Sequence, residues 1–365
     1  MIYVEDLLNT LKKKKINFFT GVPDSVLKDL TYKFKKNHIS VNNEGTAVSL
    51  AAGYYLATGK LPCVYMQNSG LGNAINPLIS ITNKNIYSIP SILIIGWRGS
   101  PNSRDEPQHQ VMGRKTKQIL KLLGIKYFVA RNKKDLEKFE EMIEYSRSQL
   151  TSIACLIERS SIKNKKSKTQ KKIINKYKVY RYNFIKELVN LIKIKSNVIS
   201  STGFISRELD HILSKKKYLN IKPFYMVGGM GHSASLTLGV SLKSKKQNIC
   251  LDGDGALLMH LGSLGIVKKY GKKNFKYILL RNDTHESVGC QPTNSTHINY
   301  KILSKSFGFR KYLLITKELD FKNVVKKLIN SPGPSFLEVR IKNGSISNLG
   351  RPKNLKFVKK KFMLK

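Results

Sequence analysis

A carboxylate and a carboxamide follow two apolar stretches of this chain, at positions where they could hold a metal ion. Asp254 comes after the short apolar run 249–251, and Asn282 comes shortly after the apolar run 275–280. Apolar residues at helical spacing predict a helix over 256–270, and so a β-α-β unit. Because parallel strands bring their carboxyl ends to one edge of a sheet, we expect Asp254 and Asn282 to face one crevice. Two hard oxygen donors beside the backbone amides of a helix start suit Mg²⁺ bridging a diphosphate.

The Gly-Asp-Gly triplet around Asp254 and its spacing to Asn282 resemble the diphosphate motif of thiamine-diphosphate enzymes. The resemblance implies that Asp254, Asn282 and the main-chain carbonyl of Thr284 hold Mg²⁺. It also implies cofactor contacts at Gly253, Gly255 and Ala256. The family usually has a second asparagine where this chain has Arg281, but the position of the metal ligand is retained.

An acid in the amino-terminal half, Glu44, matches the second half of such a site. It follows a strand expected over 39–42 and precedes an apolar helix predicted over 47–57. Taken alone, a carboxylate at a helix start is explained by the helix macrodipole. The resemblance implies instead that Glu44 comes from a separate domain and protonates N1′ of the cofactor's aminopyrimidine. Beside the Gly-Asp-Gly unit, we favour this catalytic role.

A glycine-rich segment at 228–232 supplies the third feature, before a helix predicted over 236–242. The family places a large apolar side chain between the two rings of the cofactor. Met230 fits that place, because its flanking glycines permit close approach of the backbone. The alternative is a core methionine in a turn. The resemblance also implies cofactor contacts at Thr202, Gly203 and His232.

The composition is strongly basic, with 66 Lys and Arg against 23 Asp and Glu and a formal net charge of +43. Only a dozen of the basic residues are arginine, the side chain best suited to bidentate phosphate contacts. The lysines are spread over expected loops and helix faces, and the chain is also rich in Ile and Asn, which indicates drift in a genome rich in A and T. We therefore expect weak, salt-sensitive adsorption to polyanions and no specific nucleic-acid partner. A noncatalytic lysine-rich protein that binds nucleic acid or another surface is the alternative of a different class.

Cellular location is suggested by the cysteines and by the apolar runs. The four cysteines contain no Cys-x-x-Cys pair and are expected to be buried, reduced thiols. No apolar run approaches the length of a membrane span, and the first residues do not resemble a signal peptide. We expect a cytoplasmic protein without a membrane partner.

Two α/β segments meet at a lysine-rich stretch, and 365 residues suffice for two such domains. Strands are expected at 17–20, 39–42, 63–66, 91–95 and 154–157, and then at 197–200, 249–251, 277–280 and 335–338. Their alternation with helical patterns predicts two doubly wound α/β domains with parallel sheets. With the resemblance, these become a pyrimidine-binding domain at 1–162 and a diphosphate- and Mg²⁺-binding domain at 179–365, joined by a linker at 163–178.

Several further segments resemble the phosphonopyruvate decarboxylases, a group within the same family. They lie at 21–25, 43–45, 65–74, 96–99, 105–109, 202–203, 206–209, 231–232, 287–289 and 291–293. Cys290 is a departure, since glycine is expected there. The resemblance implies decarboxylation of 3-phosphonopyruvate to phosphonoacetaldehyde in the biosynthesis of phosphonates such as 2-aminoethylphosphonate. It also implies a homodimer or larger assembly with the site between subunits. Sulfopyruvate, or another 2-oxo acid, is the alternative substrate; the continuous two-domain chain favours the phosphonate.

A doubly anionic substrate calls for fixed positive charge and polar donors. Arg98 and Arg104 are candidates, in a loop expected at the carboxyl end of a strand, although Arg98 could equally be an ion-pair partner. Ser25 lies where related decarboxylases place a polar group near the substrate carboxylate; it could also cap a helix that starts at Val26.

Two histidines are candidates for proton transfer, because imidazole titrates near neutral pH. These are His109 and His285. For both, a histidine that only makes a hydrogen bond in a loop is the alternative.

Overall fold

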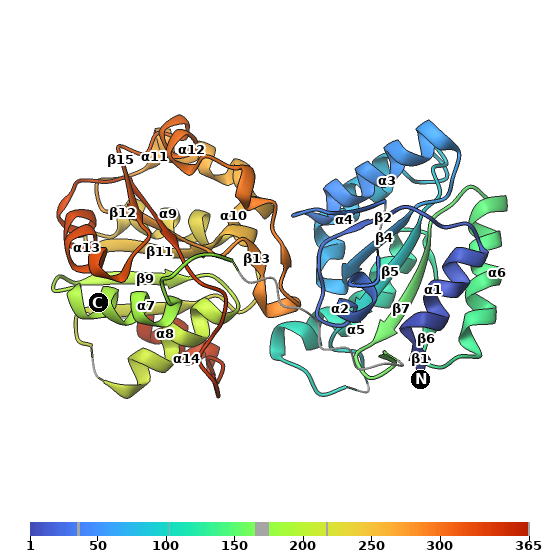
Figure 1. The fold of residues 1–365 in the computed structure, drawn as a ribbon, viewed down its shortest axis with the longest axis horizontal. Coiled ribbons are helices and arrows are strands. Elements are labelled where there is room, and N and C mark those ends of the chain that lie inside the picture. Colours follow the sequence, from blue (N-terminus) through green and yellow to red (C-terminus); the bar gives the residue numbers. More distant parts are fainter. Residues whose placement is uncertain (35–36, 102, 165–174, 217, 364–365) are drawn as a thin grey trace. The chain divides into compact units, whose positions relative to one another are not determined.

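The computed structural model describes residues 1–34, 37–101, 103–164, 175–216 and 218–363. The chain divides into two compact units, unit 1 (residues 1–171) and unit 2 (residues 172–365), and each has its own sheet (Figure 1). Most of the linker predicted at 163–178 lies outside the described residues. The predicted domain boundaries therefore stay a prediction.

Unit 1 is built on a six-stranded sheet in the order β3-β2-β4-β5-β7-β6, in which every pairing is parallel. Its strands are β2 (Phe19–Gly21), β3 (His38–Ser40), β4 (Cys63–Gln67), β5 (Ile92–Trp97), β6 (Lys126–Ala130) and β7 (Ile153–Glu158). Its helices are α1 (Val4–Lys13), α2 (Lys28–Thr31), α3 (Glu44–Thr58), α4 (Leu71–Ser80), α5 (Pro107–Leu122) and α6 (Asp135–Ser148). A separate parallel pair joins β1 (Ile2–Tyr3) to β8 (Ile162–Lys163). Alternate residues of the central strands enter opposite cores, which explains their unbroken apolar sequences.

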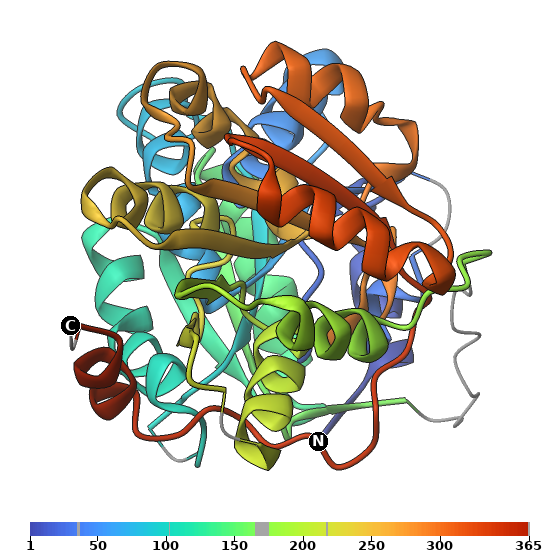
Figure 2. The same ribbon diagram turned by 90° about the vertical axis from the view of Figure 1, so that its left-hand side faces the viewer.

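Unit 2 has a second six-stranded parallel sheet, in the order β10-β9-β11-β12-β16-β15. Its strands are β9 (Ser196–Ser200), β10 (Ile221–Tyr225), β11 (Gln247–Gly253), β12 (Phe275–Arg281), β15 (Lys311–Ile315) and β16 (Ser335–Arg340). Its main helices are α7 (Arg181–Leu191), α8 (Phe204–Lys215), α9 (Ser233–Lys243), α12 (Tyr300–Ser306), α13 (Phe321–Asn330) and α14 (Leu355–Met363). Ile278 and Leu280 enter one core and Tyr277 and Leu279 the other, so helices cover both faces (Figure 2).

The two sheets have the same strand order when the strands of each are numbered along the chain. In both, the second strand lies on one side of the first, and the third lies on the other side. The order therefore reverses between β2 and β4 in unit 1 and between β9 and β11 in unit 2. Open α/β sheets bind ligands at such a point, beyond the carboxyl ends of the strands. The predicted fold class, two doubly wound parallel α/β domains, is confirmed.

The helix predicted over 256–270 is wrong as a single element. The segment forms α10 (Asp254–Met259), a 3₁₀ stretch (Leu261–Ile266) and α11 (Val267–Tyr270). His260 leaves the helical conformation, with φ −136° and ψ 49°, and two glycines follow within the 3₁₀ stretch. Glycine lowers helix propensity, so the apolar spacing alone overestimated the helix.

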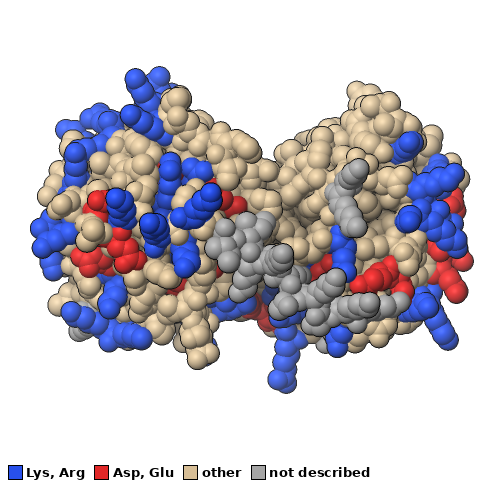
Figure 3. Space-filling model, viewed as in Figure 1, with Lys and Arg blue, Asp and Glu red and all other residues tan. Residues whose placement is uncertain are grey.

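The spread of charged side chains over the surface and the burial of most cysteines agree with the predictions from the composition. In the view of Figure 3, Lys and Arg side chains are spread over the surface of each unit and interspersed with acidic ones. Within the described ranges, none of the helices combines the length and apolar content that crossing a bilayer requires. Cys63, Cys155 and Cys250 are buried thiols, as predicted, whereas Cys290, which is also outside any disulfide, is partly exposed.

Candidate active site

Asp254 and Asn282 lie together at the carboxyl edge of the sheet in unit 2. Asp254 is the first residue of α10, directly after β11, and Asn282 directly follows β12, which pairs with β11. Both are buried, at 2% and 6% exposure. The Asn282 main-chain N–H points at Oδ1 of Asp254 over 3.5 Å. The structure therefore brings the two predicted metal ligands together at one edge of the sheet, beside the reversal of the strand order.

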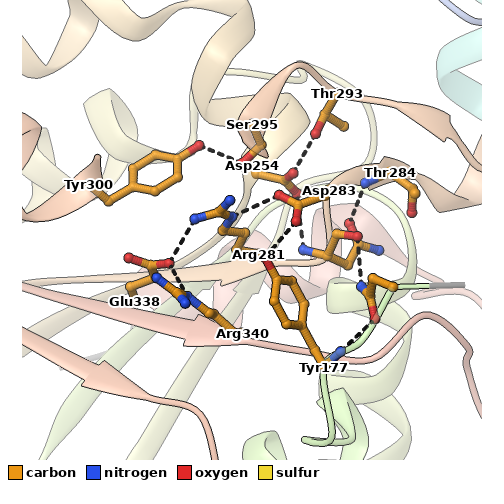
Figure 4. A network of polar contacts seen from close by, with 12 residues as sticks. Tyr177, Asp254, Arg281, Asp283, Thr284, Thr293, Ser295, Tyr300, Glu338 and Arg340 are labelled. Carbon is orange, nitrogen blue, oxygen red and sulfur yellow. Dashed lines mark hydrogen bonds and ion pairs between the residues drawn. The ribbon is translucent and has the colours of Figure 1, made fainter. Parts of the chain in front are cut away.

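The Asp254 carboxylate lies in an environment that lacks a compensating cation among its contacts in the described residues. Its Oδ2 accepts a 2.5 Å hydrogen bond from the hydroxyl of Thr293 (Figure 4). The pKa of Asp254 is raised to about 6. Burial is the largest cause, and the negative charge of Asp283 acts in the same direction. A bound divalent cation would lower this pKa and further favour the ionised form.

Asn282 and Thr284 complete the predicted set of oxygen donors. The Asn282 side chain accepts from the Thr284 main-chain N–H at 3.2 Å through Oδ1 and donates from Nδ2 to Glu286 at 3.1 Å. In the ranges that the structure covers, no three His, Cys, Asp or Glu side chains are grouped to hold a metal. The predicted set contains just one such side chain, and its amide and carbonyl oxygens suit a hard cation such as Mg²⁺. These residues fit the metal.

Arg281, the departure from the family pattern, is buried and braces the same loop. Its Nε donates to Asp283 at 2.7 Å, its Nη1 donates to Glu338 at 3.1 Å, and its guanidinium lies over the ring of Tyr300 (Figure 4). Asp283 has a left-handed backbone, with φ 59°, and also accepts from Tyr177 at 2.6 Å. The arginine thus holds a strained turn in place without contacting a predicted metal ligand.

The loops after β9 and β10 are joined beside this edge. The hydroxyl of Thr202 accepts a 3.1 Å hydrogen bond from the main-chain N–H of Gly228. Gly228, Gly229 and Gly231 all have positive φ, so the segment around Met230 requires glycine. Met230 is partly buried.

The residues next to these loops differ in exposure. Gly203, with φ 91°, directly precedes α8. His232 is exposed and stacks on His260, with ring centroids 4.4 Å apart. Their cofactor contacts stay predictions, like those of Thr202 and Met230.

His285 is buried against the glycine that follows Asp254. A Cβ built on Gly255 would come within 2.8 Å of the His285 ring, so a side chain at Gly255 would displace the imidazole. Burial lowers the pKa of His285 to about 4, so the ring is neutral at pH 7. Its Nε2 has no hydrogen-bond partner in the described part of the chain. Cys290 donates its main-chain N–H to the carbonyl of His285 and has φ 59°, a conformation that favours the glycine expected there.

Glu44 is the first residue of α3 in unit 1 and is only 5% exposed. Asn43 caps the helix through its side chain, so the carboxylate of Glu44 is not needed as the cap. The Oε2 of Glu44 accepts from the Asn73 amide at 2.7 Å, and a Cβ on Gly70 would overlap Oε1. Burial raises the pKa of Glu44. The geometry gives a protonatable acid in a fixed position.

Ser25 does not cap a helix, so that alternative is wrong. The helix α2 begins at Lys28, and Asp24 accepts the main-chain N–H groups of Val26 and Leu27, both at 3.1 Å. The hydroxyl of Ser25 instead accepts from Nη1 of Arg98 at 3.0 Å. Ser25 therefore remains available for a ligand at the carboxyl end of β2.

Arg98 is a buried ion-pair partner, the alternative left open for it. Its Nε and Nη2 donate to the two oxygens of Asp105 at 2.6 and 2.5 Å, and the pair is largely buried. Arg104 is exposed. Burial, and the positive charge of Arg98, lower the pKa of His109 to about 4, whereas Asp105 opposes that shift. Because Asp105 neutralises the positive charge of Arg98, Arg104 is the stronger candidate to bind an anionic substrate.

Sequence reasoning missed a buried acid in unit 1 and an ion pair in unit 2. Asp24, in the segment after β2, is 1% exposed, and burial raises its pKa to about 6. Arg181 and Glu286 form a 2.7 Å ion pair in unit 2 that reaches Asn282. No periodicity or motif marks these partners, because Arg181 and Glu286 are far apart in the sequence.

Comparisons with known proteins cover both units. Residues 1–121 match the thiamine pyrophosphate enzyme N-terminal TPP binding domain, and residues 201–339 match the C-terminal TPP binding domain. The chain is 30% identical to a phosphonopyruvate decarboxylase of Streptomyces viridochromogenes, over 97% of this chain and 92% of that protein. A second, of Streptomyces hygroscopicus, is 30% identical over 97% and 91%. A sulfopyruvate decarboxylase of Methanosarcina acetivorans is 25% identical over 98% of this chain and 96% of that protein.

Proposed function

The chain belongs to the thiamine pyrophosphate (thiamine diphosphate) enzymes, and from this premise we propose that it decarboxylates 3-phosphonopyruvate to phosphonoacetaldehyde and CO₂ with Mg²⁺ as the second cofactor. It is a thiamine-diphosphate-dependent decarboxylase of 2-oxo acids. The observation that carries the substrate is the 30% identity to phosphonopyruvate decarboxylases over 97% of the chain. Such a product would enter phosphonate biosynthesis.

Unit 2 offers the diphosphate and metal half of the site. Asp254, Asn282 and the carbonyl of Thr284 would hold Mg²⁺, and the amides at the start of α10 would face the diphosphate. When bound, thiamine diphosphate supplies an electron sink for the electrons that remain as CO₂ leaves. The buried, uncompensated carboxylate of Asp254 supports this assignment.

Unit 1 offers the acid. Since Asn73 donates to Oε2 of Glu44, the proton of the carboxyl group is placed on Oε1. Burial raises the pKa of Glu44 above that of an exposed glutamate, which favours the protonated acid that would donate to a ring nitrogen. Because the two halves belong to different units, we propose that the chain works as a homodimer or larger assembly, with unit 1 of one subunit facing unit 2 of another.

The substrate would meet polar groups from the loops of unit 1. Ser25, oriented by Arg98, would donate to the substrate carboxylate, and Arg104 would approach the phosphonate. The neutral imidazoles of His109 and His285 could accept or relay protons.

Sulfopyruvate is the second candidate substrate. The continuous two-domain chain does not separate the two substrates, because the sulfopyruvate decarboxylase of Methanosarcina acetivorans also matches over nearly its whole length. Charge does separate them: a phosphonate carries about one more negative charge than a sulfonate at neutral pH. The higher identity to the phosphonopyruvate decarboxylases favours the phosphonate.

A decarboxylation assay tests the proposal. The purified chain, with thiamine diphosphate and Mg²⁺, is given phosphonopyruvate, sulfopyruvate or pyruvate, and CO₂ release is measured. We expect the highest kcat/KM for phosphonopyruvate. A higher value for sulfopyruvate would overturn the substrate and leave the cofactor assignment standing, whereas no turnover of any 2-oxo acid would overturn both.

A further inference from the structure

Asn282 can present either side of its amide to a metal, and only one side is a ligand. The carboxamide has an oxygen, which binds Mg²⁺, and an NH₂ group, which repels it. Rotation by half a turn about the last side-chain bond exchanges the two. A site that depends on Asn282 therefore needs a neighbour that distinguishes its NH₂ group from its oxygen.

Glu286 is placed to make that distinction. Its Oε2 accepts from Nδ2 of Asn282 at 3.1 Å, and a carboxylate oxygen accepts hydrogen bonds but donates none. The flipped amide would place two oxygens in contact. On the other side of the same amide, the Thr284 main-chain N–H donates to Oδ1 at 3.2 Å, which favours the same orientation.

The carboxylate of Glu286 is itself held by two donors, of which Arg181 is buried. Nη1 of Arg181 donates to Oε2 at 2.7 Å, and the main-chain N–H of Gly344 donates to Oε1 at 2.8 Å. The side chain of Arg181 is 3% exposed, and its other edge is fixed by two hydrogen bonds to Glu208, at 2.9 and 3.1 Å. The chain Glu208–Arg181–Glu286 thus ends on the Asn282 amide, within unit 2.

We propose that Glu286, held by Arg181, is a positioning residue that fixes the Asn282 carboxamide with its oxygen toward Mg²⁺. This inference rests on the proposed metal site. Outer partners that orient a ligand typically change metal affinity 10- to 100-fold when replaced. Arg281 is the contrast, since its bonds to Asp283 and Glu338 bypass Asn282.

The first experiment measures Mg²⁺ binding by isothermal titration calorimetry at saturating thiamine diphosphate. Glu286→Gln is expected to weaken Mg²⁺ binding about 10- to 100-fold, because glutamine can turn its own NH₂ toward Asn282. Glu318→Gln is the matched control: this exposed carboxylate of unit 2 accepts from Tyr180 and Asn183, and its change should leave the affinity within twofold. Circular dichroism checks the fold. If Glu286→Gln is unfolded, Glu286→Asp keeps the charge beside Arg181 but falls short of Asn282, and the same loss is expected.

A second substitution separates orientation from general support of the loop. Asn282→Asp has two equivalent oxygens but places a carboxylate against Glu286, so alone it should also weaken binding. Combined with Glu286→Gln, the new glutamine can donate to the new carboxylate, and the double variant should bind Mg²⁺ at least tenfold more tightly than the weaker single variant. If Glu286 only supported the structure of the loop, the losses of Mg²⁺-binding free energy in the two single variants would add in the double variant.

The outcomes distinguish this inference from the proposed function. Unchanged Mg²⁺ affinity in Glu286→Gln, or losses that add in the double variant, would overturn the positioning role while the unmodified protein still bound both cofactors. If the unmodified protein bound neither Mg²⁺ nor thiamine diphosphate, the proposed site would fail and the positioning role would fall with it.

Discussion

Units 1 and 2 have the same strand order, and burial raises the pKa of both Glu44 and Asp254, yet the two units hold their proposed site residues in place by different contacts. Glu44 in unit 1 accepts one hydrogen bond from the neutral amide of Asn73. In unit 2, Asn282 is the proposed ligand beside Asp254, and its amide donates to Glu286, which is paired with the buried Arg181. The shared sheet therefore determines where a site lies, whereas the loops determine which side chains hold its residues in place.

The difference agrees with the two proposed tasks. An acid that must carry a proton is best kept away from cations, and burial alone raises its pKa. A metal ligand such as Asn282 must instead be held in one orientation, which the neighbouring pair Arg181–Glu286 can supply. Substitutions in each unit test this contrast.

The largest effect is expected in unit 2. Asp254→Ala removes the carboxylate of the proposed metal site, so Mg²⁺-dependent retention of thiamine diphosphate should be lost and decarboxylation should fall to background. Because Asp254 lies at the start of a short helix at the sheet edge, the circular dichroism spectrum should remain that of the unmodified protein. Calorimetric titration with thiamine diphosphate and Mg²⁺ measures the loss. A variant that kept the cofactor with the same Mg²⁺ dependence would remove the diphosphate-site interpretation.

The second-largest effect is expected in unit 1. It should lower turnover and leave cofactor binding almost unchanged. Glu44→Gln keeps the size and polarity of the side chain but removes its titratable proton. Turnover should drop by roughly two to four orders of magnitude, the range usual for a lost acid–base group, while cofactor affinity changes only a few-fold. Steady-state kcat and calorimetric titration measure the two quantities separately. Near-normal kcat would return Glu44 to a structural role at the start of α3.

A smaller effect should separate the two arginines of unit 1. Arg104→Ala should raise KM for phosphonopyruvate roughly ten- to hundred-fold, since a charge-assisted hydrogen bond contributes about 1.5–3 kcal/mol. Activity on pyruvate should hardly change. Arg98→Ala leaves the Asp105 carboxylate buried without its cation. We therefore expect this variant, unlike Arg104→Ala, to have a lower melting temperature than the unmodified protein. Equal loss on both substrates with Arg104→Ala would assign this residue a structural role too.

The smallest effect concerns Asp24 and the dependence of stability on pH. Its folded pKa of about 6 lies above the ordinary value of 3.8, so the folded state binds the proton more tightly. The free energy of unfolding should therefore decrease as pH rises from about 4 to about 6 and then level off. Asp24→Asn should remove this decrease and raise the melting temperature at pH 7 by a few degrees, at about 2–4 °C per kcal/mol. Thermal unfolding from pH 4 to 7 tests this, with the exposed Glu141→Gln as control. A melting temperature that still fell with pH in Asp24→Asn would assign the effect to another group.

The central strands could be predicted because their burial on both faces produces unbroken apolar runs. The three longer strands that were missed, β6, β10 and β15, all lie at sheet edges. There one side of the strand is unpaired and its sequence is mixed, as in Lys-Tyr-Phe-Val-Ala of β6. Periodicity does not mark such strands.

The candidate site divides in a similar way. Asp254, Asn282 and Glu44 are marked by their position after apolar runs, and the structure buries all three at the carboxyl edges of the sheets. The positioning pair Arg181 and Glu286 carries no local mark, because its contact depends on how α7 packs beside the loop after β12. Long-range ion pairs of this kind require the folded chain to be seen.

The close approach of Glu44 to Gly70 also limits how the site can vary. A side chain at position 70 would displace the Glu44 carboxylate from its present place, so the position of the acid depends on this uncharged glycine. In a library of variants randomised at position 70, active clones should be almost entirely glycine, although the residue carries no functional group. A screen that searched only among acids and bases would overlook it.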